Sequence, residues 1–239
     1  MCPKIDKTDM AQEYHNNCSL CGRNSEVFKD LDKDELKKID SHRVSIRYKP
    51  GEIIFKQGTP CYNFICITQG LVKLYIEHQR NRNLIIGLMR PVNYIYEPGF
   101  FVDKHHHFTA LAAEETTACL IDINVMKELF FSNQAFSYDF IQRISRQALG
   151  LFDRISSCTH KHVFGKVADT LLYLHPKIYP ENPFYLSLCR QDLADLSGIT
   201  KESVIRVLKK FQEEGIISIN GDQIEIFDRE RLEVISDKG

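Results

Sequence analysis

The chain is 239 residues long, which exceeds the size of a typical single domain and predicts two domains. Hydrophobic residues make up 43% and charged residues 26%, a composition typical of a soluble globular protein. The formal net charge of −1 excludes a globally basic protein, so any contact with DNA must depend on a local concentration of positive charge.

The sequence predicts neither a membrane span nor an export signal. No apolar run approaches the roughly 18 residues that cross a bilayer, and the polar N-terminus lacks the apolar core of a secretory signal. The eight cysteines therefore indicate a reducing compartment, where thiols bind metals, carry out redox chemistry or fill a core. We expect a cytoplasmic protein.

The first half of the chain changes from a polar segment to a series of short strands. Residues 1–30 carry two cysteines three positions apart, and Asp32–Asp40 is predicted to form a short helix. From Val44 to Ile123 the apolar runs are short and are separated by glycine and proline. This pattern is typical of an antiparallel sandwich or barrel.

The apolar period changes near Phe130 and indicates one long amphipathic helix of about 22 residues. Its apolar positions recur at spacings of three and four, namely Phe136, Phe140, Ile144, Ala148, Leu151 and Ile155. The helix either packs on its own domain or forms a near-heptad seam with a second copy of the chain. Its length and its position between two domains favour a dimerisation helix.

The C-terminal part is predicted to contain three helices. The first, Val163–Leu174, is amphipathic and ends before Pro176. The second, Gln191–Leu196, is followed by a turn at Ser197-Gly198 and by a third helix from Lys201 to about Glu214.

A β-hairpin is predicted after these helices. Strands Ile216–Ile219 and Gln223–Phe227 flank Asn220-Gly221. Asn-Gly favours the type I′ turn, which requires positive φ at both central residues.

The segment Leu188–Asp228 has the pattern of a winged helix-turn-helix. Leu193 and the small Ala194 form the buried face of its first helix, Gly198 can adopt the left-handed conformation of a tight turn, and Thr200 is a good N-cap. The inward positions of the following helix are Val204, Val207 and Leu208.

The outward face of this second helix carries the residues expected to contact DNA. They are Lys201, Glu202, Ser203 and Arg206. Residues 200–210 contain four basic side chains and one acidic side chain, a local net charge of +3. Arginine can donate two hydrogen bonds to a guanine edge, and glutamate can accept one from the cytosine amino group. Arg190, Gln191 and the helix N-terminus at Thr200 suit phosphates. The alternative is an ordinary three-helix core with solvated charges.

These residues resemble the CRP/FNR family of bacterial transcription regulators, and the resemblance extends over nearly the whole chain. Arg190-Gln-Asp-Leu-Ala and Thr200-Lys-Glu-Ser-Val-Ile-Arg-Val-Leu resemble the family's recognition motif. Tyr48-Lys-Pro-Gly-Glu, Phe55-Lys-Gln-Gly-Thr-Pro and Ile67-Thr-Gln-Gly-Leu-Val-Lys-Leu-Tyr resemble its cyclic-nucleotide-binding-type β-roll.

The resemblance implies an α+β fold with an antiparallel, jelly-roll-like β-roll, a long dimerisation helix and a C-terminal winged helix-turn-helix. The corresponding ranges are 1–30 for the N-terminal segment, 31–132 for the β-roll, 133–157 for the helix and 158–239 for the DNA-binding domain. It further implies a homodimer that binds a palindromic DNA site and contacts RNA polymerase.

Two positions depart from the family pattern. Cys189 stands where the family usually has a serine or threonine helix cap. Ile205 replaces the small or hydroxyl residue that often helps to select the base, so the recognised DNA sequence stays open.

A cyclic nucleotide is the first input that the resemblance suggests. The corresponding positions are Tyr96 and Glu97, which match a Gly-Glu-Leu stretch, and His107 and Phe108, which match an Arg-Ser pair. Glu97 could hold a ribose hydroxyl, but the guanidinium that neutralises the phosphate is missing. The sequence therefore argues against cAMP and leaves another small molecule in this effector pocket open.

An iron–sulfur cluster is the second input. Cys18, Cys21 and Cys119 resemble cluster positions of the oxygen-sensing branch, but Val27 occupies the place of a further cysteine. Three thiolates are too few for the usual four-cysteine site, so Cys2, His15 or an exogenous ligand would complete it. Zinc on Cys18 and Cys21, or purely structural thiols, are the alternatives.

Haem or another metal on the tract His105-His106-His107 is the third input. In a strand only His105 and His107 would share a face, and a solvated turn is the alternative.

Two other classes of function are alternatives to a transcription regulator. A cyclic-nucleotide-type regulatory module would be attached to a catalytic or membrane segment, and none is expected after Gly239. An enzyme has no support, because no P-loop, dinucleotide-binding glycine turn, zinc-protease motif or nucleophile elbow is present.

Overall fold

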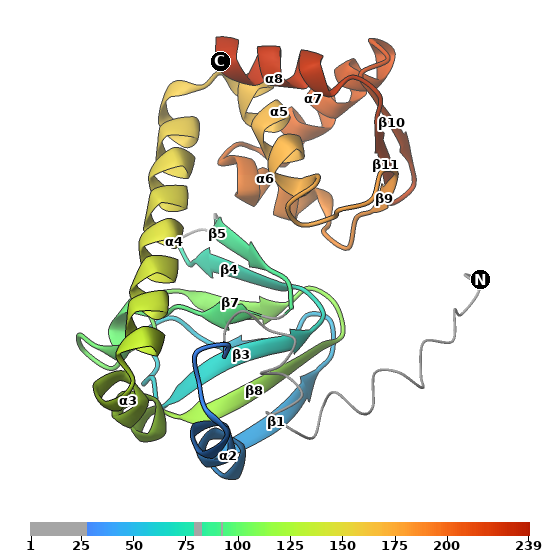
Figure 1. Ribbon diagram of the computed structural model, residues 1–239. Helices are drawn as coiled ribbons and strands as arrows, with labels where there is room; N and C mark the ends of the chain where they lie inside the picture. Colours follow the sequence, from blue (N-terminus) through green and yellow to red (C-terminus); the bar gives the residue numbers. More distant parts are fainter. Residues whose placement is uncertain (1–27, 79–82, 92) are drawn as a thin grey trace.

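The computed structural model describes residues 28–78, 83–91 and 93–239 and has the predicted α+β class (Figure 1). A β-roll lies at one end, a long helix runs along one side, and a helical domain with a small sheet lies at the other end. In this described part of the chain, none of the helices combines the length and apolar character of a membrane span.

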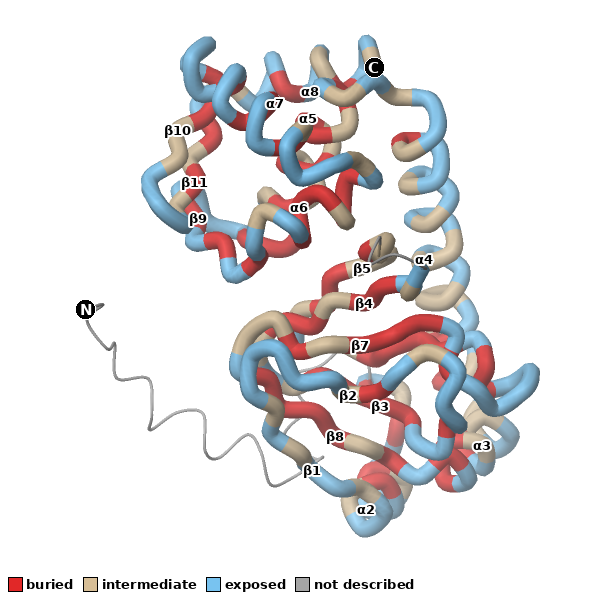
Figure 2. Tube along the Cα trace, turned by 180° about the vertical axis from the view of Figure 1, so that it is seen from behind, coloured by how far each residue is buried: buried red, intermediate tan, exposed pale blue. Residues whose placement is uncertain are grey.

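Two four-stranded antiparallel sheets form the β-roll. The first has the order β1-β8-β3-β6, with bounds β1 Arg43–Tyr48, β8 Thr116–Asp122, β3 Asn63–Gln69 and β6 Asn93–Ile95. The second has the order β2-β7-β4-β5, with bounds β2 Ile53–Phe55, β7 Thr109–Ala112, β4 Val72–Ile76 and β5 Leu84–Met89. The apolar residues between the sheets are buried (Figure 2). The predicted antiparallel β-domain is therefore confirmed.

Short helices cover the end of the β-roll. Helix α2, Lys33–Ser41, confirms the predicted helix and begins at Asp32, whose carboxylate accepts from the backbone N–H groups of Asp34 and Glu35. The 3₁₀ helix η1, Pro98–Phe100, follows β6.

Helix α3, Ile123–Ser132, was not predicted as a separate helix. Asp122 ends β8 and caps α3, since its Oδ1 accepts from the N–H of Asn124 at 2.7 Å. Asn133 then ends α3 and caps the next helix by accepting from the N–H of Phe136 at 3.0 Å. Asn133 therefore separates two helices where the apolar pattern of the sequence indicated one.

The long helix α4 spans Gln134–His160 and has 27 residues. Its predicted seam is wrong in its first half, because Phe136 and Phe140 are buried in the aromatic core of the β-roll and Ile144 packs against the same core. The large apolar side chains that α4 exposes are Tyr138, Ile141, Leu149, Phe152 and Ile155, each at least 59% exposed, and of these only Ile155 belongs to the predicted seam. One face of the helix therefore packs on its own domain, and a seam with a second copy stays a prediction that concerns the exposed face.

The C-terminal domain combines four helices and a three-stranded sheet. Its elements are α5 Val163–Leu174, β9 Phe184–Tyr185, α6 Arg190–Ser197, α7 Lys201–Glu213, β10 Ile217–Asn220, β11 Gln223–Ile226 and α8 Arg229–Lys238. The sheet order is β10-β11-β9. The predicted α5, helix-turn-helix and hairpin are confirmed, whereas β9 and α8 were not predicted.

The C-terminal domain packs directly on the edge of the β-roll. Leu71, Tyr75, Ile85 and Leu88 of the β-roll belong to the same buried cluster as the core of the helical domain. Lys73 Nζ of β4 lies 2.5 Å from Asp192 Oδ1 of α6, and the phenol oxygen of Tyr173 on α5 accepts from the N–H of Leu88 at 3.1 Å. Apolar packing and polar contacts together fix the helix-turn-helix against strands β4 and β5.

Candidate functional site

Helices α6 and α7 form a helix-turn-helix whose inner faces are fully packed. Ala194 of α6 is completely buried, and Val204, Val207, Leu208 and Phe211 form the buried face of α7. The Asp192 carboxylate accepts from the N–H of Cys189 at 2.9 Å, so α6 is capped although Cys189 replaces the usual hydroxyl residue.

The turn between the two helices requires glycine. Gly198 ends α6 with φ +64°, a conformation that costs other residues roughly 1–2 kcal/mol. A Cβ atom at this position would lie 3.2 Å from Cys158 Sγ of α4. The turn therefore lies close to the long helix α4.

The predicted base-contacting residues lie together at the start of α7. Thr200 caps the helix by accepting from the N–H of Ser203 at 3.3 Å. Lys201, Glu202 and Arg206 are exposed, while Ser203 is half-buried. The side chain of Ile205 is 46% exposed beside them, so the outer face of α7 presents an apolar group as well.

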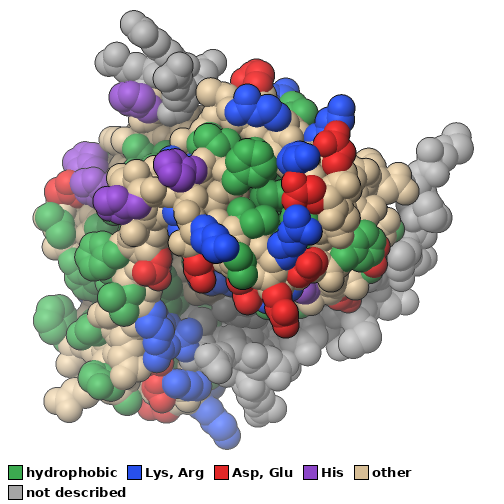
Figure 3. Space-filling view, turned by 90° about the horizontal axis from the view of Figure 1, so that it is seen from above, with side chains coloured by type: hydrophobic (Ala, Val, Ile, Leu, Met, Phe, Trp, Pro, Cys, Tyr) green, Lys and Arg blue, Asp and Glu red, His purple; other side chains and the backbone are tan. Residues whose placement is uncertain are grey.

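The positive charge of α7 is concentrated at its first turns. Lys209 and Lys210 each lie within 4 Å of a glutamate four residues later, Glu213 and Glu214. Lys201 and Arg206 have no carboxylate within ion-pairing distance in the described residues. Seen from above, this end of the molecule shows Lys and Arg side chains mixed with Asp and Glu (Figure 3). In the described part of α7, the cations without an acidic partner therefore lie in its first turns.

The predicted phosphate-contacting residues flank this face. Arg190 is half-buried and its Nη2 donates to the carbonyl oxygen of Gly221 at 3.4 Å, which connects α6 to the turn of the hairpin. The amide of Gln191 donates to Asp195 at 2.7 Å.

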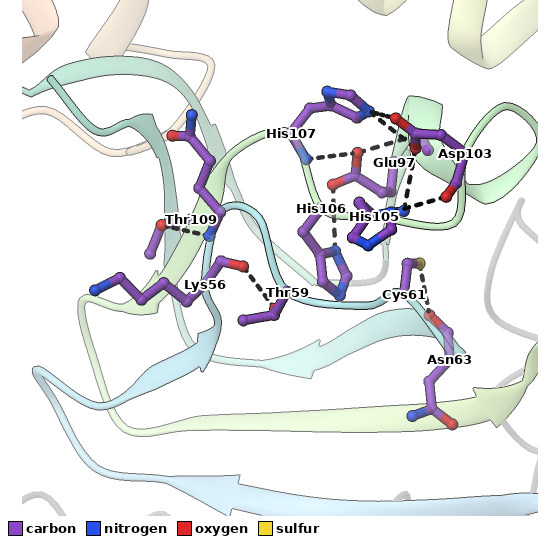
Figure 4. A network of polar contacts seen from close by, with 12 residues as sticks. Lys56, Thr59, Cys61, Asn63, Glu97, Asp103, His105, His106, His107 and Thr109 are labelled. Atoms are coloured by element: carbon purple, nitrogen blue, oxygen red, sulfur yellow. Dashed lines mark hydrogen bonds and ion pairs between the residues drawn. The ribbon is translucent and has the colours of Figure 1, made fainter.

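The predicted effector residues are brought together only in part (Figure 4). The carboxylate of Glu97 is buried, and its Oε1 accepts from the N–H groups of Gly99 at 3.3 Å and His107 at 3.1 Å. Its Oε2 lies 3.3 Å from Nδ1 of His106, whose ring stacks on Phe55 with centroids 3.8 Å apart. Glu97 thus organises the loop of residues 98–107 with donors from the chain itself.

Tyr96 and Phe108 belong to different cores. The ring of Tyr96 packs against Phe140 in the aromatic cluster next to α4, and burial raises the pKa of its phenol. Phe108 packs between the two sheets near Phe55. The four predicted pocket residues therefore do not share one cavity wall.

Two family matches cover most of the described chain. Residues 45–133 match the cyclic nucleotide-binding domain, and residues 165–235 match the Crp-like helix-turn-helix domain. The combination joins the β-roll to the DNA-binding unit in the order seen in the structure. The chain belongs to the CRP/FNR family of transcription regulators.

Individual relatives are similar to the chain over most of its length. The chain is 26% identical to "Electron transport regulator A" of Shewanella oneidensis over 86% of its length and 84% of that protein. It is 25% identical to "Nitrogen fixation regulation protein FixK" of Bradyrhizobium diazoefficiens, over 92% of its length and 93% of that protein. The structure of FixK2 from Bradyrhizobium japonicum superposes with a TM-score of 0.75 at 21% identity, over 81% of this chain and 96% of that one.

The residues of this CRP/FNR regulator do not fit the phosphate of a cyclic nucleotide. At the positions expected to match the family's arginine and serine, the His107 imidazole lies 3.1 Å from Asp103 Oδ2 and Phe108 is buried. The Glu97 oxygens already accept from the N–H groups of Gly99 and His107 and contact the ring of His106. Neither a guanidinium nor a free carboxylate is available there.

The predicted metal ligands are only partly within the described residues. Cys18 and Cys21 lie outside them, whereas Cys119 is buried in β8 opposite Cys66 of β3. His106 points inward while His105 and His107 are exposed, so the histidine tract is split between two faces. Across the residues that are described, no group of three or more His, Cys, Asp or Glu side chains could hold a metal ion.

Sequence reasoning did not find two polar features of the interface between the domains. Lys73 and Asp192 are 119 positions apart, and the guanidinium of Arg154 on α4 donates to the carbonyl oxygen of Leu196 on α6. No local pattern marks these residues, because their partners come from distant parts of the chain.

Proposed function

We propose that this CRP/FNR regulator is a homodimer that binds a palindromic DNA site through the outer face of α7 and responds to an effector. Lys201, Glu202, Ser203 and Arg206 would read base edges in the major groove. Arg190, Gln191 and the N-terminus of α7 at Thr200 would contact the phosphates that position it.

One observation carries this proposal. Lys201 and Arg206 are exposed on one face of α7, and in the described residues no carboxylate compensates them, unlike Lys209 and Lys210. Because exposed cations without partners gain most from phosphate and guanine acceptors, this end of α7 suits DNA best.

The exposed face of α4 supports the homodimer. Tyr138, Ile141, Phe152 and Ile155 repeat at heptad spacing, and a dimer would bury them. A twofold axis along α4 would present the two copies of α7 to successive major grooves, which requires a palindromic site.

Family membership supports the remaining parts of the proposal. We assign RNA polymerase as a second partner, the cytoplasm as the place of action, and no catalytic role. The effector is not a cyclic nucleotide bound in the usual manner, since the loop around Glu97 lacks the guanidinium for its phosphate.

The test begins with selection of a binding site from a random duplex library, followed by anisotropy titrations at fixed salt. Arg206→Ala should reduce the ratio of specific to non-specific affinity by about 10- to 100-fold, because one bidentate base contact discriminates by roughly 1–3 kcal/mol. Lys209→Ala is the matched control, since it removes an exposed cation of the same helix that faces Glu213. Unchanged specificity of Arg206→Ala would show that another face of the protein reads the DNA.

A further inference from the structure

A cleft of about 780 Å³ lies between the β-roll, α4 and the helix-turn-helix domain. Residues of β5, α4, α5 and α6 line it, so all three parts of the molecule contribute to its walls. This volume falls in the range of roughly 300–1,000 Å³ typical of small-molecule sites. It is distinct from the loop around Glu97, and of the four predicted effector residues only Tyr96 lines it.

The lining of the cleft is strongly basic. Its acidic side chains are Asp153 and Asp169, and its basic side chains are Arg143, Arg146, Arg154, Lys161, Lys166 and Lys177. Two of the cations are neutralised locally, since Arg143 pairs with Asp139 at 2.6 Å and Lys161 with Asp169 at 2.9 Å. Within the described ranges, no carboxylate lies within 4 Å of Arg146 or Arg154. The cleft therefore carries an excess of positive charge in a partly enclosed space.

Among the cations of the cleft, Arg154 has the contacts and burial that point most clearly to an anionic ligand. Its Nη2 donates to the carbonyl oxygen of Leu196, and its guanidinium carbon lies 5.8 Å from the centroid of the Tyr173 ring. Its Nε is buried and has no hydrogen-bond partner. Burial also lowers the pKa of this side chain. Asp169, the carboxylate that acts electrostatically on Arg154, already pairs with Lys161 at 2.9 Å. Because the guanidinium is largely removed from water, an anion placed beside it would offset the cost of its burial.

We propose that this cleft binds a phosphorylated small molecule with at least two negative charges. Arg154 supplies the central contact: its fork of donors matches phosphate oxygens, and a shift of the guanidinium away from the Leu196 carbonyl exposes the buried, unpartnered Nε to them. Arg146 and Lys166, also without carboxylate partners in the described residues, supply the remaining charge, and the Tyr173 ring forms an aromatic wall.

The position of Arg154 connects this site to the DNA-binding domain. A phosphate bound by Arg154 competes with the Leu196 carbonyl, which lies at the end of α6 next to the Gly198 turn. Occupancy of the cleft therefore alters the contact that holds the helix-turn-helix against α4. The effect on DNA binding rests on the proposed function, whereas the binding site itself does not.

The dimer leaves the cleft accessible. Arg143, Gly150 and Ser157 line it at seven-residue intervals of α4, whereas the exposed Tyr138, Ile141, Phe152 and Ile155 occupy other positions of the same repeat. Two helix positions that differ in this way face different directions. A second copy on the exposed face and a ligand in the cleft are therefore compatible.

The test is a calorimetric titration of the full-length protein with inorganic pyrophosphate, at low salt and without divalent metal or DNA. We expect saturable binding of one pyrophosphate per chain, weakened at least tenfold in Arg154→Met and about fivefold in Arg146→Gln. Arg47→Gln, a change at an exposed arginine of β1 outside the cleft, should bind as the unmodified protein does.

Arg146 is exposed on α4, so Arg146→Gln remains informative if Arg154→Met does not fold. Absence of saturable binding, or equal binding by the unmodified protein and Arg146→Gln, would overturn the proposed site. Because the titration contains no DNA, that result would leave the proposed DNA-binding function intact, and loss of DNA specificity would not affect the titration.

Discussion

The ion pair between Lys73 and Asp192 makes the docking of the two domains testable. Lys73 Nζ lies 2.5 Å from Asp192 Oδ1, and the side chains are only 19% and 11% exposed. Lys73→Met retains most of the aliphatic stem and removes the charge. Asp192 keeps its hydrogen bond to the N–H of Cys189, so α6 stays capped.

The magnitude follows from the burial of the pair. Exposed ion pairs contribute roughly 0.2–1 kcal/mol, while loss of one partner of a fully buried pair costs about 3–5 kcal/mol. Lys73 and Asp192 lie between these limits, so we expect the variant to favour the undocked arrangement by about 2 kcal/mol. That corresponds to an increase of about 30-fold in the undocked population.

Hydrogen exchange measures this population at one amide. The N–H of Leu88, on the edge strand β5, donates to the phenol oxygen of Tyr173 across the domain interface. Its exchange should accelerate about 30-fold in Lys73→Met. Lys56→Met is the control, since Lys56 lies 3.9 Å from Glu77 in an exposed pair within the β-roll. An unchanged Leu88 rate in a folded Lys73→Met variant would refute the reasoning that this pair holds the domains together.

Three further predictions concern the dimer, the turn and pH. Phe152→Asp should yield a monomer in light scattering because it places a charge in the exposed face of α4, whereas Phe131→Asp, which alters a 91% exposed side chain of α3, should leave the dimer intact. Gly198→Ala should lower the urea-derived free energy of unfolding by about 1–2 kcal/mol because φ is +64°, whereas Gly150→Ala, in a helix with open space, should raise it by about 0.5–1 kcal/mol. The pKa of Asp139 is lowered, since its hydrogen bonds and ion pairs with neighbouring cations outweigh the opposing effect of burial. Its stabilising contribution should be complete above the unfolded pKa of about 3.9 and be lost as the pH falls through the folded value, so Asp139→Asn should show a weaker loss of stability in acid.

The elements with strong local signals were predictable. Helix α5 has the predicted bounds, Val163–Leu174, because its amphipathic period ends just before Pro176. The turn at Gly198 and the hairpin at Asn220-Gly221 depend on backbone preferences that a few neighbouring residues determine.

The elements and partners without such signals were not predictable. Helix α8 presents mainly charged residues and is held by the burial of Leu232 and Ser236, which only the packed domain provides. The apolar residues of α4 could not be divided between core and dimer face, since Phe140 and Ile141 are equally apolar and differ only in what lies opposite them. The carboxylate of Glu97 was a candidate to bind a ligand, but in the folded loop the N–H of His107 and the ring of His106 already contact it.

By itself, the sequence determined the family of this protein and its role as a DNA-binding regulator, because a helix-turn-helix and its wing are specified by residues close together in the chain. The tertiary structure alone decided which cations remain without partners. Charge compensation depends on contacts between residues far apart in sequence, as between Lys73 and Asp192 or Arg154 and Leu196. The uncompensated charge at the start of α7 and in the cleft beside Arg154 therefore became visible only once the domains were assembled.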